Sequence, residues 1–445
     1  MEHRSVPCVA TMNDIVIPLS APQAADSASV GPKAGNLAAL GHAGLPIPDG
    51  FCLTADANRA QIAALGLEAT ARGVFGADDG PQARRHALDM KLNLMDKPVL
   101  DDIREPLLAA RRALLERNLG AKVVVRSSAL VEDRDGSSFA GQFESYLELE
   151  DETEFLIAVR ACWAALWSTR ALRYMATHDL DPADTAMALL VQPLVAARCA
   201  GGALSRTAEG DILINATWGL GSAIAQGEVA PDRYILSRDG KLKESVTGSK
   251  QRQHAASCAH AGRSRIGNSM LAPTPCLDAR QAIELADLVR RTEELMKMPV
   301  EIEWAMDERG FKLLQARPLH LQAGAVPDES WRRHPRINGQ PAGVGWATGR
   351  ACVVNCECEL IRVAPGDVLV TKMAGPALGQ ILPRVAGVVA ELGGSTSHLA
   401  SLARERGIPM VLGALDATLR IPDGSMVAVD GVSGVVRWMA MQDAA

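Results

Sequence analysis

The chain has 445 residues, 48% of them hydrophobic, and its mean hydropathy of +0.04 is that of a globular protein long enough for two or three domains. Its 52 acidic and 46 basic residues give a net charge of −6 and form no long runs, which argues against a basic surface for nucleic acid. No stretch approaches the ~18 consecutive apolar residues of a membrane-spanning helix, and the N-terminus lacks the apolar core of a signal peptide. We therefore expect a cytoplasmic protein that binds neither nucleic acid nor membranes and keeps its nine cysteines as reduced thiols.

The first part of the chain predicts a helix and, further on, a buried strand. Residues 31–51 (GPKAGNLAALGHAGLPIPDGF) indicate a loop, a helix over 36–43 and an extended exit, because Gly44 and the prolines after it are helix stop signals. Helical and mixed sequence leads on to residues 122–129 (KVVVRSSA), whose run of valines is typical of a buried strand. We expect this strand to end at Arg126.

The middle of the chain predicts more strands, then a change of character. Strands are predicted over 186–195 and 211–219, and a helix over 279–298 leads into a hairpin of the strands 301–307 and 311–319. Residues 322–343 are polar, contain Pro and Gly and lack periodicity, so we place an interdomain linker at 322–340, between domains at 1–321 and 341–445. Short strands and glycine turns after the linker predict a compact α/β unit of the ~100 residues usual for a domain.

The predicted hairpin carries polar side chains at alternating positions. Because side chains alternate between the two faces of a strand, Glu301 and Glu303 share one face, as do Gln315 and Arg317 on the partner strand. If the strands align in register, two carboxylates, an amide and a guanidinium converge on one cleft. An exposed charged hairpin has the same pattern and is the alternative interpretation.

One histidine stands at a predicted helix start. Strand sequence over 385–391 ends at a glycine pair, and Ser395–Ser397 supply N-cap side chains to a helix that ends near Gly407. His398 therefore lies in the first turn, where unpaired N–H groups and a partial positive charge favour a neutral imidazole and attract an anion. A neutral imidazole is a nucleophile that can accept a phosphoryl group. A polar residue that faces solvent is the alternative.

The sequence around this histidine resembles a known family. GGSTSHLASLARERGIPMVLG followed by DGSMVAVDGVSGVV is similar to the phosphohistidine swivelling domain of the phosphoenolpyruvate-utilising enzymes, and places His398 on the position that carries the phosphoryl group. VGPKAGNLAALGHAGLPIPDGF, VVVRSSALVEDRDGSSFAGQFESYL, WGLGSAIAQGEVAPDRY and EIEWAMDERGFKLLQARPLH resemble the ATP-grasp domain of the same family. The resemblance implies an α/β protein with an ATP-grasp nucleotide-binding domain followed by a small swivelling β/β/α phosphohistidine domain.

The resemblance also implies roles for single residues. It places ATP contacts at Lys33, Arg126, Gly141, Ser145, Gln192, Glu303, Gln315 and Arg317. Glu303 and Gln315 are then the expected Mg²⁺ ligands, since Mg²⁺ takes oxygen ligands, and Arg317 neutralises the transferring phosphates. Glu301 stands where the family has an aspartate, and its longer side chain indicates a supporting role behind the metal ligands. Lys250, in TGSKQRQ, is a further candidate for the phosphates.

The mechanism implied by the resemblance is a dikinase reaction. ATP pyrophosphorylates His398, AMP and phosphate are released, and the linker allows the phosphohistidine to swing to an acceptor. We expect the chain to lack the substrate-binding barrel of the larger members, and we expect a small-molecule acceptor bound between its own domains or on a partner subunit. An ATP-dependent activating or condensing enzyme of a specialised biosynthetic pathway is one alternative. A nucleotide-responsive binding protein without turnover is the other, against which the retained charged residues argue.

Overall fold

The chain folds into two compact units, Met1–Val195 and Ala196–Ala445. The computed structural model describes residues 15–76, 80–119, 121–133, 139–143, 145–248, 274–320, 331 and 333–439. Lys250 lies outside the described residues. The boundary between the units falls inside the range predicted as one ATP-binding domain, and the predicted domain limits stay a prediction.

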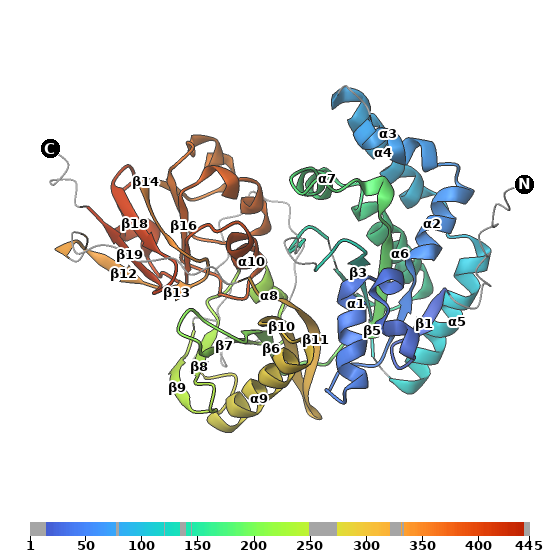
Figure 1. The fold of residues 1–445 in the computed structure, drawn as a ribbon, viewed down its shortest axis with the longest axis horizontal. Helices are drawn as coiled ribbons and strands as arrows, with labels where there is room; N and C mark the ends of the chain where they lie inside the picture. The colour runs from blue at the N-terminus through green and yellow to red at the C-terminus, as the bar shows by residue number, and fades with distance from the viewer. Residues whose placement is uncertain are drawn as a thin grey trace, which may run out of the picture. The chain divides into compact units, whose positions relative to one another are not determined.

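An antiparallel five-stranded sheet forms the centre of the first unit (Figure 1). Its strand order is β1-β2-β5-β3-β4, with β1 at Val16–Pro18, β2 at Phe51–Leu53, β3 at Val123–Ala129, β4 at Ser145–Leu149 and β5 at Met187–Pro193. The predicted strand at 122–129 is confirmed, but it does not end at Arg126. It continues to Ala129 because Ser127, Ser128 and Ala129 pair with β5.

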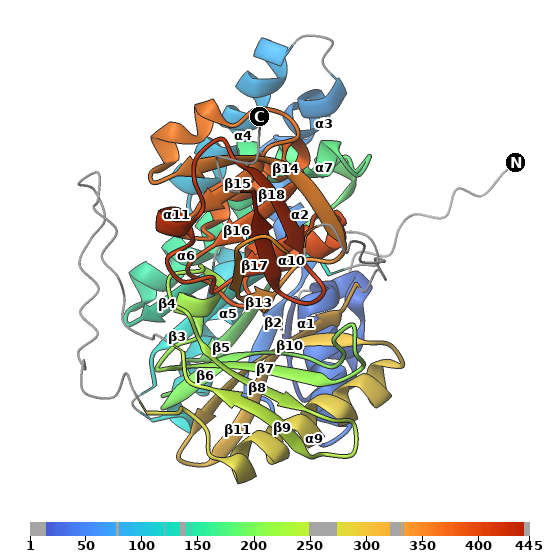
Figure 2. The same ribbon diagram turned by 90° about the vertical axis from the view of Figure 1, so that its left-hand side faces the viewer.

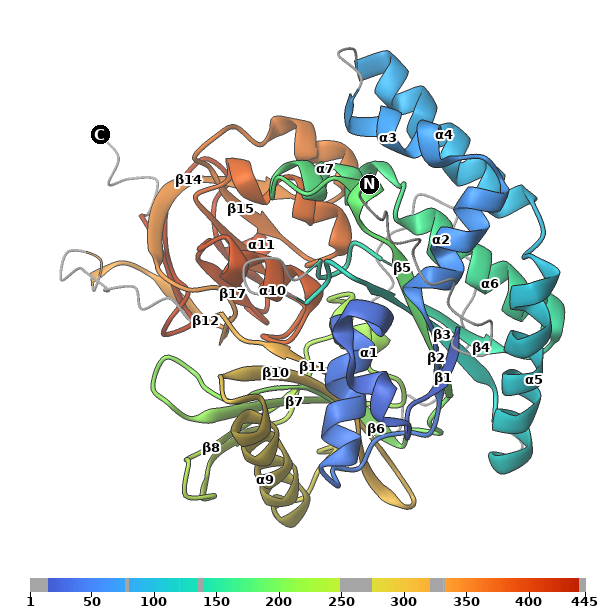
Figure 3. The same cartoon turned by 45° about the vertical axis from the view of Figure 1, so that its right-hand side comes forward.

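Helices cover both faces of this sheet. They are α1 at Ser27–His42, α2 at Ala55–Ala64, α3 at Glu68–Gly76, α4 at Gly80–Asp96, α5 at Asp101–Arg117, α6 at Glu152–Ala165 and α7 at Thr169–Ala176, with 3₁₀ turns at Pro22–Ala25 and Pro182–Asp184. Helix α1 lies on one side of the sheet and α5 and α6 on the other (Figures 1 and 3). The stretch Glu152–Ala176 is long and apolar enough to cross a membrane, but 56% of its most apolar window is buried inside the protein, as in a core helix.

A kink joins α1 to β3. Gly31, inside α1, has φ of +78°, and a Cβ there would lie 2.2 Å from the carbonyl oxygen of Ser128, so only glycine fits. The Ser128 hydroxyl donates to the carbonyl of Val30 at 2.7 Å and accepts from the amide of Ala34 at 3.1 Å. Helix α1 therefore begins earlier than the predicted residue 36, because a side chain of β3 caps its second segment.

The second unit begins with an antiparallel six-stranded sheet. Its order is β11-β10-β6-β7-β8-β9, with β6 at Cys199–Leu204, β7 at Ile212–Trp218, β8 at Asp232–Leu236, β9 at Leu242–Val246, β10 at Val300–Asp307 and β11 at Gly310–Pro318, and with α8 at Ser222–Ala225. Helix α9, Ala279–Met296, starts at an Asp278 capping box and packs across one face (Figure 2). The predicted hairpin of β10 and β11 is confirmed.

The rest of the second unit is built on an eight-stranded mixed sheet of order β12-β19-β18-β14-β15-β16-β17-β13. The elements are β12 at Arg336–Asn338, β13 at Gln340–Pro341, β14 at Trp346–Val354, β15 at Val368–Thr371, β16 at Gly387–Ala390, β17 at Met410–Leu412, β18 at Met426–Asp430, β19 at Val435–Trp438, α10 at His398–Glu405 and α11 at Ala417–Arg420, with 3₁₀ turns at Glu357–Arg362, Pro376–Gln380 and Leu382–Arg384. Strand β14 pairs antiparallel with β18 through its first half and parallel with β15 through its second. Strands β12 and β13 come from the end of the predicted linker, where edge pairing satisfies their backbone groups.

The cysteines differ from the sequence-based expectation. Cys356 and Cys358, expected to be reduced, form a disulfide just after β14, with a Cα–Cα distance of 5.4 Å. That separation lies within the range that a disulfide can bridge. Among the described residues the free cysteines are all buried: Cys52, Cys162, Cys199, Cys276 and Cys352.

Candidate functional site

His398 is the first residue of α10, as the sequence predicts. The helix starts there because the Ser397 side chain accepts the amide of Ala400 at 3.3 Å, which is an N-cap bond. The preceding loop leaves β16 through Gly393, whose φ is +102°. His398 is half-buried, while the serines and threonine before it are buried. The imidazole therefore stands at a helix N-terminus, where the macrodipole favours an anion.

A row of four residues crosses the six-stranded sheet of the second unit. Gln315 on β11 lies opposite Glu303 on β10, which lies opposite Gly202 on β6, which lies opposite Asn215 on β7. Directly opposed residues point to the same face of a sheet. Along this row that face carries an amide, a carboxylate, a glycine without a side chain and a second amide. The register that the sequence left open is thereby decided: Glu303 faces Gln315, and Glu301 faces Arg317.

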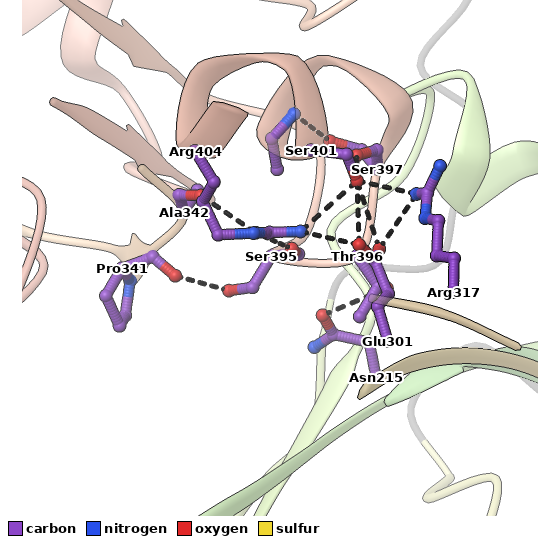
Figure 4. Close-up of polar contacts among 11 residues, drawn as sticks. Asn215, Glu301, Arg317, Pro341, Ala342, Ser395, Thr396, Ser397, Ser401 and Arg404 are labelled. Atoms are coloured by element: carbon purple, nitrogen blue, oxygen red, sulfur yellow. Dashed lines mark hydrogen bonds and ion pairs between the residues drawn. The ribbon is translucent and has the colours of Figure 1, made fainter. Parts of the chain in front are cut away.

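The loop before His398 lies on this row. The Thr396 hydroxyl donates to the Asn215 side chain at 3.4 Å, and a Cβ on Gly202 would lie 2.6 Å from the Thr396 Cβ (Figure 4). The backbone of the loop is also bound, because the amide of Gly393 donates to the carbonyl of Val229 at 2.9 Å. Thr396, two residues before His398, therefore packs directly beside the position of Glu303.

A buried charged cluster lies two residues further along β10 and β11 (Figure 4). The Ser401 hydroxyl of α10 donates to both Glu301 oxygens, at 2.9 and 3.1 Å, and accepts from Arg317 Nη2 at 2.6 Å. Arg404 Nη2 lies 2.9 Å from Glu301 Oε2, and Arg317 Nη2 lies 3.2 Å from Glu301 Oε1. We call Glu301, Arg317, Ser401 and Arg404 the docking cluster. It joins α10 to the β10–β11 hairpin.

The charged groups of the docking cluster shift one another's pKa. Burial alone raises the pKa of Glu301, but the guanidiniums of Arg317 and Arg404 hold that pKa at about 2. Burial lowers the pKa of Arg404, and the carboxylate of Glu301 opposes this shift. The cluster contains two guanidiniums and one carboxylate, and all three side chains are buried. The cluster therefore places two guanidiniums and a carboxylate beside the helix that begins with His398.

The first unit holds the remaining predicted ATP contacts. These are Lys33, Arg126, Gly141, Ser145 and Gln192, whereas Glu303, Gln315, Arg317 and His398 belong to the second unit. Lys33 Nζ lies 2.5 Å from Glu132 Oε1, and the other Glu132 oxygen accepts the amide of Ala129 at 3.1 Å. The predicted phosphate-binding lysine is thus held by a buried carboxylate that the sequence analysis did not single out.

Three of these residues share one face of the first sheet. Arg126 on β3 lies opposite Ser145 on β4, and Gln192 on β5 lies opposite Val124, two residues before Arg126. Since positions two apart share a face, Arg126, Ser145 and Gln192 point the same way. Ser128, two residues after Arg126, contacts the segment of α1 that carries Lys33. That face therefore gathers two cations, a hydroxyl and an amide.

The phosphate loop predicted at 135–145 is described in part. Residues 134–138 and 144 lie outside the described residues. Gly141 has φ of +67°, a conformation that glycine adopts without strain. Just before it, Phe139 stacks on Phe143 and contacts Tyr174, which ties this end of the loop to α7.

The site contacts that sequence reasoning missed come mostly from residues in distant segments. Ser401 and Arg404 follow His398 by three and six residues, a spacing that places side chains on one side of a helix and could have indicated them. Asn215, Gly202 and Glu132 carry no comparable local signal, because register and packing bring them to their partners.

Two protein-family models match this chain. The model of the pyruvate phosphate dikinase AMP/ATP-binding domain matches residues 27–334, more than half of the chain, and that of the PEP-utilising enzyme mobile domain matches residues 363–434. The chain belongs to the PEP-utilising enzyme family. The predicted α/β fold class, a nucleotide-binding domain followed by a mobile domain, is confirmed. His398 and the docking cluster residue Ser401 both lie in the mobile domain of this PEP-utilising enzyme, whereas Glu301 lies in the nucleotide-binding match.

Relatives of this PEP-utilising enzyme include curated phosphoenolpyruvate synthases. The chain is 31% identical to a probable phosphoenolpyruvate synthase of Methanothermobacter thermautotrophicus, 31% to the phosphoenolpyruvate synthase of Pyrococcus furiosus and 33% to that of Aeropyrum pernix. Each alignment covers 92% of this chain, but only 61% of the first relative and 56% of the other two. The chain therefore spans little more than half the length of these relatives.

Proposed function

We propose that the protein is an ATP-dependent dikinase-type phosphotransferase with His398 as the phosphoryl carrier. A neutral imidazole nitrogen of His398 attacks the β-phosphorus of ATP, the bond from that phosphorus to the α-phosphate oxygen breaks, and AMP leaves. The terminal phosphate of the resulting pyrophosphohistidine then passes to water or inorganic phosphate. The remaining phosphohistidine transfers its phosphoryl group to an acceptor.

One observation carries this proposal: the loop that ends at His398 lies on the row formed by Gln315, Glu303, Gly202 and Asn215. Thr396 contacts Asn215 and packs on Gly202, which lies opposite Glu303. His398, the proposed nucleophile, follows Thr396 by two residues. Positioning of this kind supplies most of the catalysis in phosphoryl transfer, where little covalent chemistry is left to the protein.

Charge around His398 supports a phosphorylated state. The first amides of α10 have no intrahelical carbonyl partner, and the macrodipole favours a negative group there. Arg317 contributes positive charge from β11, where it contacts Ser401 one turn after His398. A phosphoryl group on His398 would therefore meet a helix N-terminus, one turn before the serine that Arg317 contacts.

The residues present fit a magnesium–nucleotide substrate. Mg²⁺ binds through one or two carboxylates together with phosphate oxygens, and Glu303 with Gln315 offers one carboxylate and one amide oxygen directly opposed across two strands. No cluster of three or more His, Cys, Asp or Glu occurs among the described residues, which suits an ion held partly by phosphates. When bound, the ion would neutralise the polyphosphate. Lys33, Arg126 and Gln192 would hold and orient ATP from the first unit.

The acceptor is a small molecule bound by this chain or by a partner subunit, in the cytoplasm. The curated relatives are named phosphoenolpyruvate synthases, but this chain spans only 56% of the Pyrococcus furiosus protein, so their names do not identify its acceptor. Copurification and assays with small alcohols and carboxylic acids separate a partner-borne acceptor site from an autonomous one.

Labelled ATP tests the carrier role directly. The protein is incubated with Mg²⁺ and ATP labelled either at the β- or at the γ-phosphate, and AMP and protein-bound label are followed. We expect acid-labile β-label on the wild type together with AMP, and none on His398→Ala. Phosphoenzyme that persists in His398→Ala would refute the assignment, and label on neither protein would favour a nucleotide-responsive binding protein.

A further inference from the structure

We propose that Glu301, Ser401 and Arg404 are positioning residues, which dock α10 on the β10–β11 hairpin so that His398 can be phosphorylated. Glu301 acts in this proposal as the fixed partner of α10 and not as a metal ligand. The inference rests on the proposed function, because phosphorylation of His398 is the step that the docking serves.

Helix geometry explains why these residues control His398. An α-helix turns once in 3.6 residues, so Ser401 and Arg404, three residues apart, are neighbours on one face of α10, and Ser401 lies about one turn after His398. Both side chains bind Glu301, at 2.9 Å each. Two contacts on successive turns fix both the rotation of the helix and its position along the axis. His398, at the open end, then has one orientation relative to β10.

Arg404 also holds the loop that precedes His398. Its Nη1 donates to the carbonyl of Ser395 at 2.6 Å and to that of Ala342 at 2.9 Å, while Nη2 binds Glu301 (Figure 4). The Ser395 hydroxyl in turn donates to the carbonyl of Pro341 at 2.6 Å. One planar guanidinium thus joins the histidine loop, the end of β13 and strand β10. A lysine could not span these partners with a single nitrogen.

The contacts of Glu301 suit docking better than metal binding. Both carboxylate oxygens already interact with α10 or Arg317, at 2.9 to 3.2 Å, and the residue is 4% exposed. A magnesium ligand in a nucleotide site needs an oxygen turned to the ion and its phosphates. Glu303, two residues on, is only half-buried and lies opposite Gln315, so it keeps that role.

The docking extends to backbone contacts beside the cluster. The amide of Gly393 donates to the carbonyl of Val229 at 2.9 Å, and a Cβ on Gly227 would lie 2.6 Å from the carbonyl oxygen of Ala374. Backbones that approach so closely leave no room for a layer of water or side chains. The Gly393 amide is therefore a local reporter of docking that does not depend on any reaction.

The test compares Arg404 variants with a matched control. Arg404→Met removes the guanidinium. Arg404→Lys keeps the positive charge but replaces the planar set of N–H donors by a single nitrogen. Glu293→Gln is the control, because Glu293 on α9 is also a buried carboxylate held by two arginines, Arg206 at 2.6 Å and Arg238 at 2.5 Å. Its substitution disturbs an equivalent network that does not touch α10.

Two measurements are made on each full-length protein. The first is the single-turnover rate of β-label transfer from ATP, together with ATP affinity. We expect Arg404→Met to be slower on the order of 100-fold, as for a nucleophile displaced by ~1 Å, with unchanged ATP affinity and with Arg404→Lys between it and the wild type. The second is hydrogen exchange of the Gly393 amide, which should become faster in both Arg404 variants. Glu293→Gln should change neither.

Each result decides a separate question. The inference is overturned if Arg404→Met takes label at the wild-type rate, if Gly393 exchange is unchanged, or if Glu293→Gln slows labelling equally. Wild-type protein without β-label refutes the proposed function, and the exchange measurement then still decides the docking. If Arg404→Met does not fold, Ser401→Ala serves in its place, because it removes only a hydroxyl. Like Arg404→Met, it is expected to slow labelling and to make exchange of the Gly393 amide faster.

Discussion

Replacing Gly202 by alanine is the sharpest test of where the histidine loop lies. The added Cβ would stand 2.6 Å from the Thr396 Cβ and 2.8 Å from its hydroxyl oxygen, whereas ordinary contact begins at 3.4 Å. One of the two must withdraw by the difference, about 0.8 Å. Gly202 is in the middle of β6, paired with both Glu303 and Asn215, so the loop is the part that can move.

The expected effect follows from this displacement. A shift of ~1 Å in a reacting group can cost on the order of 100-fold in rate, so Gly202→Ala should slow β-label transfer to His398 by 10- to 100-fold, roughly. Overpacking of this kind typically costs about 1–3 kcal/mol of stability. No charge changes, and Glu303 stays in place, so ATP affinity should stay the same.

Rapid-quench single-turnover labelling with β-labelled ATP measures the rate, and thermal unfolding measures the stability. Gly221→Ala is the matched control, because a Cβ at Gly221 has its nearest neighbour at 3.6 Å, an ordinary contact. Gly202→Ala protein that labels at the wild-type rate with unchanged stability would show that Thr396 does not pack on Gly202 in the reactive state. The contact of Thr396 with Gly202 would then not be what positions His398 for phosphorylation.

The remaining predictions concern the metal, the buried carboxylate and the disulfide. Glu303→Ala should raise the Mg²⁺ concentration needed for AMP formation, and an unchanged Mg²⁺ titration would remove Glu303 from the metal site. The pKa of Glu301 is about 2 in the folded protein against an ordinary 4.5, so its stabilisation is complete above pH ~4.5 and is lost as pH falls toward 2. The free energy of unfolding, measured with urea, should therefore fall over that pH range by on the order of 3 kcal/mol more in the wild type than in Glu301→Gln. The same dependence of this free energy on pH in both proteins would contradict the ion pairs. Alkylation of denatured protein without reductant should leave Cys356 and Cys358 unmodified, and modification of both would disprove the disulfide.

The sequence predicts what depends on neighbours along the chain. A glycine pair followed by serines is enough to start α10 at His398, because N-capping is local. The alternation of Glu301 and Glu303 identifies a shared face, because the strand period is two. It does not identify their partners across the sheet, since any register satisfies the alternation.

Tertiary structure decides which distant groups meet. Arg404 binds Glu301 across 103 positions of sequence, and Thr396 reaches Asn215 across 181. Strand β3 continues past Arg126 for the same reason, because pairing with β5 outweighs the local signal. The sequence by itself thus determines the helix that begins at His398. Only folding determines the carboxylate that holds that helix, because burial can join two such charges only where both chain segments are already packed together.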